Sequence, residues 1–214
     1  MAGAAELSGY LTATTDYTWR GVTQSDSDAA LQAGADLSFD SGLFIGIWGS
    51  TVDISNGPTR QRDRQVNYYI GYTTPVTPGW SLGGHVVAYF YPGAEGDIDY
   101  DYTEYSATAS FEDRVWLEFS ISDDLFDAGY KTKNYEVYFE QPIADSWALG
   151  GGLGYYDWSD VVGSGYGHWQ LGLTRSAGHL DVDFRYHDTN RWVPIVSSPD
   201  RADARFVLSV RLSF

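Results

Sequence analysis

The sequence predicts an all-β fold: a single transmembrane, antiparallel, up-and-down β-barrel of about 12 strands, with short periplasmic turns and longer extracellular loops. Three observations predict it. Apolar and polar residues alternate with a period of two along almost the whole chain. The connections between these stretches are short and long in turn. Aromatic residues make up 16% of the chain and gather near the ends of the apolar face. We expect residues 1–214 to form this one domain.

The alternation places each strand. In the first strand, Leu7, Gly9 and Leu11 share the apolar face, and Ser8 and Tyr10 share the polar face. The same pattern recurs along the chain, so the expected strands are 5–19, 29–39, 42–53, 64–74, 79–91, 101–111, 114–122, 133–141, 146–158, 166–175, 179–188 and 202–214.

The connections distinguish the two ends of the barrel. Short turns are expected at 40–41, 75–78, 112–113, 142–145 and 176–178. Longer loops are expected at 21–28, 54–63, 92–100, 123–132, 159–165 and 189–201. Because the strand number is even, both termini should lie at the short-turn end, on the periplasmic side. One stretch is ambiguous, from Leu43 to Asp53, because Phe44 and Trp48 compete with the alternating aliphatic residues for the apolar face.

Alternation alone does not say whether the apolar face points into a soluble barrel or out into lipid. The polar face is rich in Gly, Ser, Thr and Tyr and poor in Lys, which is unusual for a solvated surface. The chain ends in Phe214, like the C-terminal signal recognised by the outer-membrane barrel-assembly machinery. Aromatic residues at the strand ends resemble the interfacial girdles of membrane barrels: Tyr17, Trp19, Tyr72, Trp80, Trp147, Tyr155, Trp169 and Tyr186. These features favour the membrane barrel.

Composition excludes several other classes. The chain has no Cys, so it can form no disulfide framework, thiolate metal site or Cys nucleophile. It carries 29 Asp and Glu against 13 Lys and Arg, a formal charge of -16, so we expect no nucleic-acid partner. The apolar runs are too short for a transmembrane helix, which needs about 18 residues or more.

The first residues are expected to be unstructured. The run Met1-Ala2-Gly3-Ala4-Ala5 has neither a basic region nor an apolar core, so it is not itself a signal peptide. Small residues of this kind often follow a cleavage point. We therefore expect residues 1–5 to stand where an export signal has been removed.

A motif in the N-terminal quarter resembles a known family. The run Thr14-Thr15-Asp16-Tyr17-Thr18-Trp19-Arg20-Gly21-Val22-Thr23-Gln24-Ser25, followed by Gly46-Ile47-Trp48-Gly49-Ser50, is similar to the start of the proteobacterial TorF-like putative porins. The resemblance covers about residues 12–53; beyond that only length and alternation agree. Thr15 and Thr23 stand where the family often has Ser. The resemblance implies an outer-membrane barrel and transfers no catalytic residues.

The polar face predicts the lining of the interior. Charged and imidazole groups expected to line a pore are Asp36, His85, Glu104, Arg114, Glu118, Glu136, Glu140, Asp181, Asp183, Arg185, Arg205 and Arg211. Acids outnumber arginines here, so they cannot all pair, and ionised groups inside a barrel need partners or water. A hydrated acidic lumen favours cations. The expected function is a porin-like outer-membrane channel for small polar solutes or ions with a mild cation preference.

The alternative is a non-conducting structural or adhesive barrel. About 12 strands lie between the packed interior of about 8 strands and the open channel of 16–18. Inward tyrosines can fill such a bore: Tyr69, Tyr89, Tyr102, Tyr138 and Tyr156. The extracellular loops would then bind lipopolysaccharide or a partner protein. Outer-membrane lipids and lipopolysaccharide are expected partners in either case.

A barrel enzyme is the least favoured interpretation. No GxSxG motif occurs, and all four histidines fall on the polar face rather than facing lipid: His85, His168, His179 and His187. Asp97, Asp99 and Asp101 alternate as in a calcium loop but lack the Gly and closing Glu of an EF-hand. We predict no catalytic residue, no metal site and no cofactor.

Overall fold

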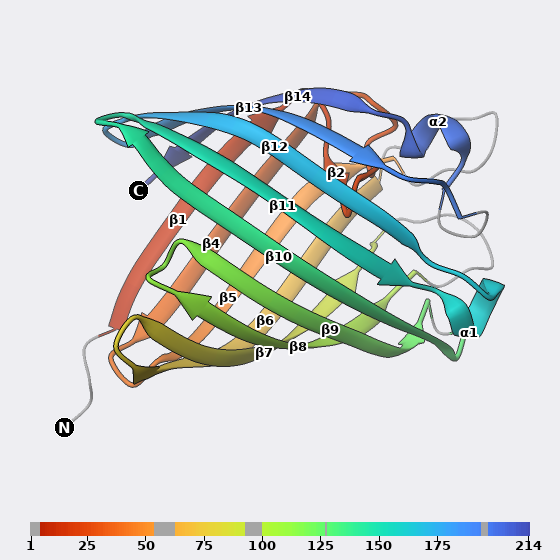
Figure 1. The fold of residues 1–214 in the computed structure, drawn as a ribbon, viewed down its shortest axis with the longest axis horizontal. Coiled ribbons are helices and arrows are strands. Elements are labelled where there is room, and N and C mark those ends of the chain that lie inside the picture. Colours follow the sequence, from red (N-terminus) through yellow and green to blue (C-terminus); the bar gives the residue numbers. More distant parts are fainter. Residues whose placement is uncertain (1–4, 54–62, 93–99, 127, 194–196) are drawn as a thin grey trace.

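The computed structural model describes residues 5–53, 63–92, 100–126, 128–193 and 197–214. Within them, twelve antiparallel strands close into one barrel (Figure 1), which confirms the predicted fold class. The strands are β1 (Ala5–Thr14), β4 (Ala30–Phe39), β5 (Leu43–Val52), β6 (Asp63–Thr77), β7 (Trp80–Phe90), β8 (Tyr102–Phe111), β9 (Val115–Leu125), β10 (Tyr130–Ala144), β11 (Trp147–Asp157), β12 (Tyr166–Ala177), β13 (Leu180–Thr189) and β14 (Arg205–Ser213). Asp97 and Asp99, considered above for calcium, lie outside the described residues.

The barrel closes between its first and last strands. Tyr10 to Thr14 of β1 pair with Ser209 to Ser213 of β14, while β1 pairs over its full length with β4. Gly9 and Phe214 exchange two backbone hydrogen bonds of 2.8 and 2.9 Å. Each strand of the barrel therefore has two neighbours, as a barrel in lipid requires for its backbone polar groups.

Short turns and long loops lie at opposite ends of the barrel. The short-turn end also holds the first described residue, Ala5, and the last, Phe214 (Figure 1). The long-loop end carries two short helices, α1 (Ser159–Val162) and α2 (Pro199–Ala202). None of the helices in the described part of the chain is long and apolar enough to cross a membrane.

Several strands are longer than predicted. β6 and β10 continue past Pro75 and Pro142, where the pairing register shifts by a residue. Proline cannot donate to the ladder, so it is tolerated at such an irregularity. β9 extends to Leu125 and β10 begins at Tyr130, so the connection between them is much shorter than the predicted 123–132 loop.

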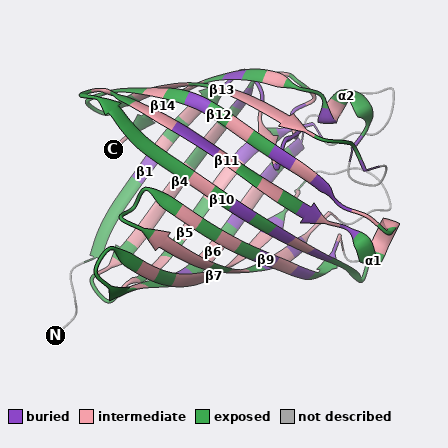
Figure 2. Cartoon of the chain, in the orientation of Figure 1, coloured by how far each residue is buried: buried purple, intermediate pink, exposed green. Residues whose placement is uncertain are grey.

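The apolar face of the strands points outward. Leu7, Leu153 and Phe206 expose 74%, 64% and 64% of their surface, and exposed positions alternate with more buried ones along the strands in Figure 2. A soluble barrel would bury these residues inside. The ambiguous stretch is also resolved: Ile45 is exposed, whereas Trp48 lines an interior cavity.

The first strand is shorter than predicted, and this changes the interior. β1 ends at Thr14, and residues 16–28, the inner hairpin, turn into the barrel with β2 (Thr18–Trp19) paired to β3 (Val22–Thr23). Tyr17 and Trp19 therefore lie inside, so their predicted place in a lipid-facing girdle is wrong. Buried ring contacts and a lipid interface both select aromatic residues, so the sequence pattern looks the same in both cases.

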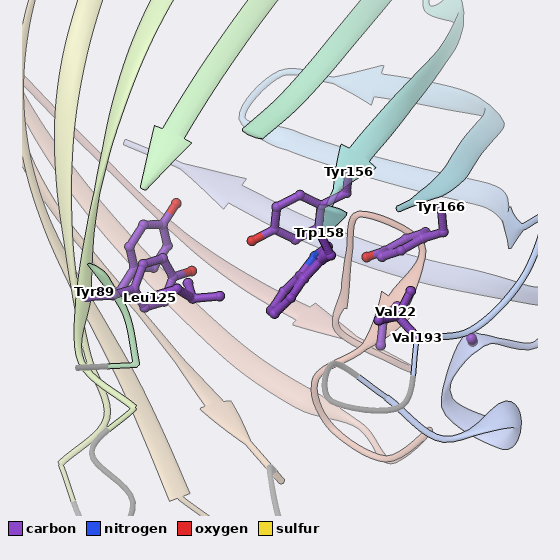
Figure 3. Close-up of a cluster of buried hydrophobic side chains, with 9 residues drawn as sticks. Val22, Tyr89, Leu125, Tyr156, Trp158, Tyr166 and Val193 are labelled. Atoms are coloured by element: carbon purple, nitrogen blue, oxygen red, sulfur yellow. The ribbon is translucent and has the colours of Figure 1, made fainter. Parts of the chain in front are cut away.

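Buried hydrophobic side chains gather at the long-loop end of the interior. The cluster comprises Val22, Tyr89, Tyr102, Leu125, Tyr156, Trp158, Tyr166, Val193 and Ala202. Figure 3 shows the labelled members lying inside the wall near the strand ends. Tyr89 and Tyr102 are stacked with ring centroids 4.3 Å apart, and Trp19 of the inner hairpin packs edge-on against Tyr89 and Tyr156. The interior is therefore narrowed at this end.

Candidate functional site

Asp16 fixes the base of the inner hairpin. Its buried carboxylate accepts hydrogen bonds from the hydroxyls of Thr23 and Ser25, on the returning side of the hairpin. It also forms an ion pair with Arg205 at 2.7 Å. Because Arg205 begins β14, the strand beside β1, this carboxylate ties the hairpin to the barrel wall.

Arg20 and Gly21 form the tip of the inner hairpin. Their φ angles are +50° and +79°. A two-residue turn with both φ values positive is the pattern of a type I′ hairpin turn. This conformation is uncommon for a side-chain-bearing residue and costs energy unless the surroundings hold it in place. Here Gly21 lies against Thr189 of β13 and His168 of β12, while the Arg20 side chain reaches further across the barrel.

The Arg20 guanidinium is held by a carboxylate and by two rings. Its two terminal nitrogens donate to the carboxylate oxygens of Glu104 at 2.8 and 3.1 Å. Its carbon lies 4.0 Å from the ring centroid of Trp19 and 4.4 Å from that of Tyr156. Burial opposes the charge, but the carboxylates of Glu104 and Glu136 raise the pKa of Arg20 above its ordinary value. Arg20 therefore stays a cation in contact with the wall.

Through this contact the Arg20 side chain links the tip of the inner hairpin to the far wall of the bore. Going round the barrel from β1, the strand β8 that bears Glu104 is the seventh in one direction and the fifth in the other. Glu104 is thus on the wall nearly opposite to the strand from which the hairpin leaves. Tyr89 of the neighbouring β7 also donates to Glu104, at 3.0 Å. The inner hairpin is a crossbar that divides this part of the interior.

A cavity lies on each side of the crossbar, and Trp19 lines both. The smaller cavity, about 130 Å³, faces Glu136, His168 and His187 on β10, β12 and β13. The larger one, about 400 Å³, faces Trp48 and Asn67 among other residues of β5, β6 and β7.

Two predicted lining residues are drawn into the contacts of the hairpin. Glu104 is 3% exposed and bound to Arg20. Glu136, 7% exposed, accepts a hydrogen bond from Asn134 at 2.6 Å and one from Tyr138, and its nearest approach to Arg20 is 4.0 Å. These two carboxylates therefore hold Arg20, and with it the inner hairpin, in place.

Other predicted lining residues form ion pairs along the wall. Asp183 and Arg185 are paired at 2.9 Å on β13, and Arg205 is paired with Asp16. Arg211 stacks over the ring of Tyr10 at 3.6 Å. All of these arginines therefore have a partner in the described residues.

The remaining predicted lining residues lie in the middle of the barrel or toward the short turns. Asp36 accepts from Tyr69 at 2.5 Å, and Glu118 accepts from Ser120 at 3.0 Å. His85 is half-buried in the larger cavity, and Asp181 is half-buried near a short turn. Arg114 and Glu140 are exposed, Arg114 in the turn between β8 and β9.

The residues that shape the crossbar are not predicted from the sequence. Trp19 is predicted at the end of the first strand, Arg20 falls between that strand and the 21–28 loop, and Asn67 is not predicted as a site residue. The signal available in the sequence is Gly21 directly after Arg20, because a residue followed by Gly is the pattern of a two-residue hairpin turn. The long-range partner, 84 residues away in Glu104, has no such signal.

Groups that bind metals are dispersed in the described part of the chain. No cluster of three or more His, Asp or Glu side chains with metal-binding geometry occurs among these residues. His168 contacts Glu136 at 3.7 Å and Asn134 at 3.3 Å, and His187 contacts Thr18 at 3.2 Å. These histidines help to pack the interior around the hairpin.

The fold is similar to that of solved porins. The KdgM porin, solved in complex with disordered oligogalacturonate, superposes with a TM-score of 0.58 at 8% identity, over 98% of this chain and 99% of that one. The NanC porin gives 0.61 at 10% identity, with the same coverages. OmpF of Salmonella typhi, in complex with daunomycin, gives 0.50 at 10% identity, over 100% and 98%. A search of the curated proteins gives no match.

The closed twelve-stranded barrel with an apolar exterior therefore has the fold of these solved porins. The chain belongs to the family described as "Bacterial protein of unknown function (Gcw_chp)", whose model matches residues 1–214.

Proposed function

We propose that this protein is a porin-like channel of the bacterial outer membrane that passes small polar solutes or ions, with a mild preference for cations. The observation that carries the proposal is a surplus of interior carboxylates inside a barrel whose exterior is apolar. The TorF-like motif and the fold shared with solved porins support it. The proposal assigns no catalytic residue.

The interior charges are unevenly paired. Among the described residues, no Lys or Arg side chain lies within ion-pair distance of Asp36 or Glu118. Glu118 stands directly opposite Glu136 in the β9–β10 register, so two carboxylates adjoin on the wall. Ionised groups without a counter-charge need water, and a hydrated acidic bore concentrates cations. This supports both a wet lumen and its cation preference.

The inner hairpin limits the width of the proposed channel. It leaves cavities of about 130 and 400 Å³ on its two sides instead of one open bore. We therefore expect slow passage and a small unitary conductance for a barrel of this strand number.

One observation favours the alternative, a non-conducting barrel whose extracellular loops bind lipopolysaccharide or a partner protein. The aromatic cluster and the inner hairpin together fill much of the long-loop end. In that case the interior is a water-filled cavity that is closed at the long-loop end and open at the short turns. The interior carboxylates are hydrated by this water.

Liposome swelling separates the two functions. Folded protein is reconstituted into lipid vesicles, which are diluted into isotonic arabinose, glucose or raffinose. The channel predicts swelling that is fastest for arabinose and slowest for raffinose, and heat-denatured protein gives the leak control. Vesicles that contain folded barrels and do not swell in any of the three sugars would establish the non-conducting alternative.

A further inference from the structure

The larger interior cavity has the walls of a ligand site. Its volume of about 400 Å³ lies within the range of about 300–1,000 Å³ that small-molecule sites occupy. Aromatic rings from the inner hairpin and from the wall face it, among them Trp19, Phe44, Trp48 and Tyr89. Trp48 is held edge-on by Tyr17, with ring centroids 5.4 Å apart, so this ring is positioned without a ligand.

Two polar groups that line the cavity, Asn67 and His85, keep unused hydrogen-bonding capacity. Asn67 is 9% exposed, and its Oδ1 accepts a hydrogen bond from Gln65 at 3.0 Å. No described residue takes the hydrogen bonds that its Nδ2 can donate. The His85 ring makes no hydrogen bond with any described residue either. The amide of Asn67 and the half-buried imidazole of His85 line the same space, so they can form hydrogen bonds with one occupant of the cavity.

The cavity is uncharged. None of the described side chains that line it is an acid, a lysine or an arginine. The ionised groups that contact lining residues come in both signs. Asp36 accepts from the hydroxyl of Tyr69 and Glu104 from that of Tyr89, while Arg211 lies over the ring of Tyr10 and Arg20 over that of Trp19. A charged solute would lose its hydration here with no counter-charge in return.

We propose that this cavity is a binding site for a neutral pyranose sugar, at the level of a mono- or disaccharide. The C–H face of such a ring packs on Trp48 or Trp19, and its hydroxyl edge bonds to Asn67 and His85. Aromatic walls with a few oriented polar groups and no charge suit a neutral sugar. An acidic sugar would find no cation in the cavity, and a flat hydrocarbon would leave the amide of Asn67 unpaired. The proposal rests on the proposed function, because the sugar reaches the cavity through the lumen.

Isothermal titration calorimetry tests the site independently of transport. The folded barrel is prepared in a detergent without a sugar headgroup and titrated with maltose, galacturonic acid or indole. We expect one saturable maltose site and binding of galacturonic acid that is about tenfold weaker. Maltose binding that is undetectable, or weaker than that of indole or galacturonic acid, would overturn the sugar class.

Two variants locate the site. His85→Leu removes a group with no described partner, so the barrel should stay folded while maltose binding weakens roughly fivefold. Trp48→Leu removes a wall of the cavity and should weaken it further. Trp80→Leu, on the exposed outer face, is the matched control and should bind normally. Maltose binding unchanged in both cavity variants would place it elsewhere and refute the proposal.

The outcomes of the two proposals can be told apart. Swelling without maltose binding refutes the sugar site and leaves the channel intact. Maltose binding without swelling keeps the site and refutes the channel. Heat-modifiable migration in gels confirms for each variant that the barrel is folded.

Discussion

The guanidinium of Arg20 and the carboxylate of Glu104 form a two-point ion pair across the barrel interior, with N–O distances of 2.8 and 3.1 Å. One side chain comes from the tip of a hairpin and the other from the far wall. The two are only 4% and 3% exposed. Removing one partner of a buried ion pair leaves the other charge uncompensated. This contact therefore holds the inner hairpin across the bore.

Arg20→Ala should release the hairpin. Glu104 then loses its counter-charge, and we expect the free energy of unfolding in urea to fall by up to about 3–5 kcal/mol, less if water reaches the carboxylate. The released hairpin should also raise the unitary conductance in a planar bilayer.

The control for Arg20→Ala is Arg175→Ala. Arg175 belongs to β12 and lies 5.6 Å from the ring of Trp147, whose side chain is exposed. We expect its removal to change stability by no more than about 0.5 kcal/mol. A conductance for Arg20→Ala equal to that of the parent protein would show that the hairpin does not limit passage.

Gly21→Ala tests the geometry of the turn. A Cβ on Gly21 would meet Cγ2 of Thr189 at 2.6 Å, in addition to the strain of a φ of +79°. Gly178 has a similar φ of +64°, but a Cβ there meets nothing within 4 Å. Each substitution carries a backbone cost of about 1–2 kcal/mol for a Cβ in the left-handed region, and Gly21→Ala should cost more because of the contact.

Hydrogen exchange distinguishes this pair of glycine variants. In Gly21→Ala the amides of the inner hairpin should exchange faster than in the parent protein, while those of the barrel strands keep their protection. In Gly178→Ala the hairpin should be unaffected. Equal exchange of the hairpin amides in both variants would contradict the described packing of the tip against β13.

Glu118→Gln tests the source of the cation preference. The amide keeps the shape and the hydrogen bond from Ser120 but removes one unpaired interior charge. We expect the reversal potential in a KCl gradient to move toward zero. Glu112→Gln makes the same charge change in the exposed turn between β8 and β9 and should have the smaller effect. An equal shift in both variants would assign selectivity to the mouth of the barrel and not to its interior.

Leu153→Arg tests the placement of the barrel in lipid. Leu153 is 64% exposed and lies near the middle of β11, so an arginine there should cost about 2–4 kcal/mol in a bilayer. Leu7 is 74% exposed and lies near the short-turn end of β1, where the same change should cost about 0–1 kcal/mol. If both variants lose the same free energy of unfolding, the predicted depth of Leu153 in the bilayer is contradicted.

The barrel wall was predictable from the sequence because its signal is local. A period of two places Leu7, Leu153 and Phe206 on one face, and the structure exposes all three. The crossbar was not predictable in the same way. Trp19 continues the alternation of the first strand, yet a reversal at Arg20 and Gly21 buries it. Nothing in local pattern distinguishes an aromatic residue facing lipid from one facing other rings.

The alternation predicts which charged residues face the interior, but it does not predict which of them pair with one another. The alternation placed Glu104, Glu118 and Asp183 on the polar face. Which of them is neutralised depends on residues distant in sequence, as Arg20 shows for Glu104 and Arg185 for Asp183. Unpaired Glu118 could be recognised only once these contacts were known.

The most direct test of the central claim is the single-channel current of the parent protein in a planar bilayer that separates two KCl concentrations. The account predicts small, stable steps whose reversal potential is biased toward potassium. Folded protein that inserts and gives no steps, or steps with a reversal potential biased toward chloride, would contradict it.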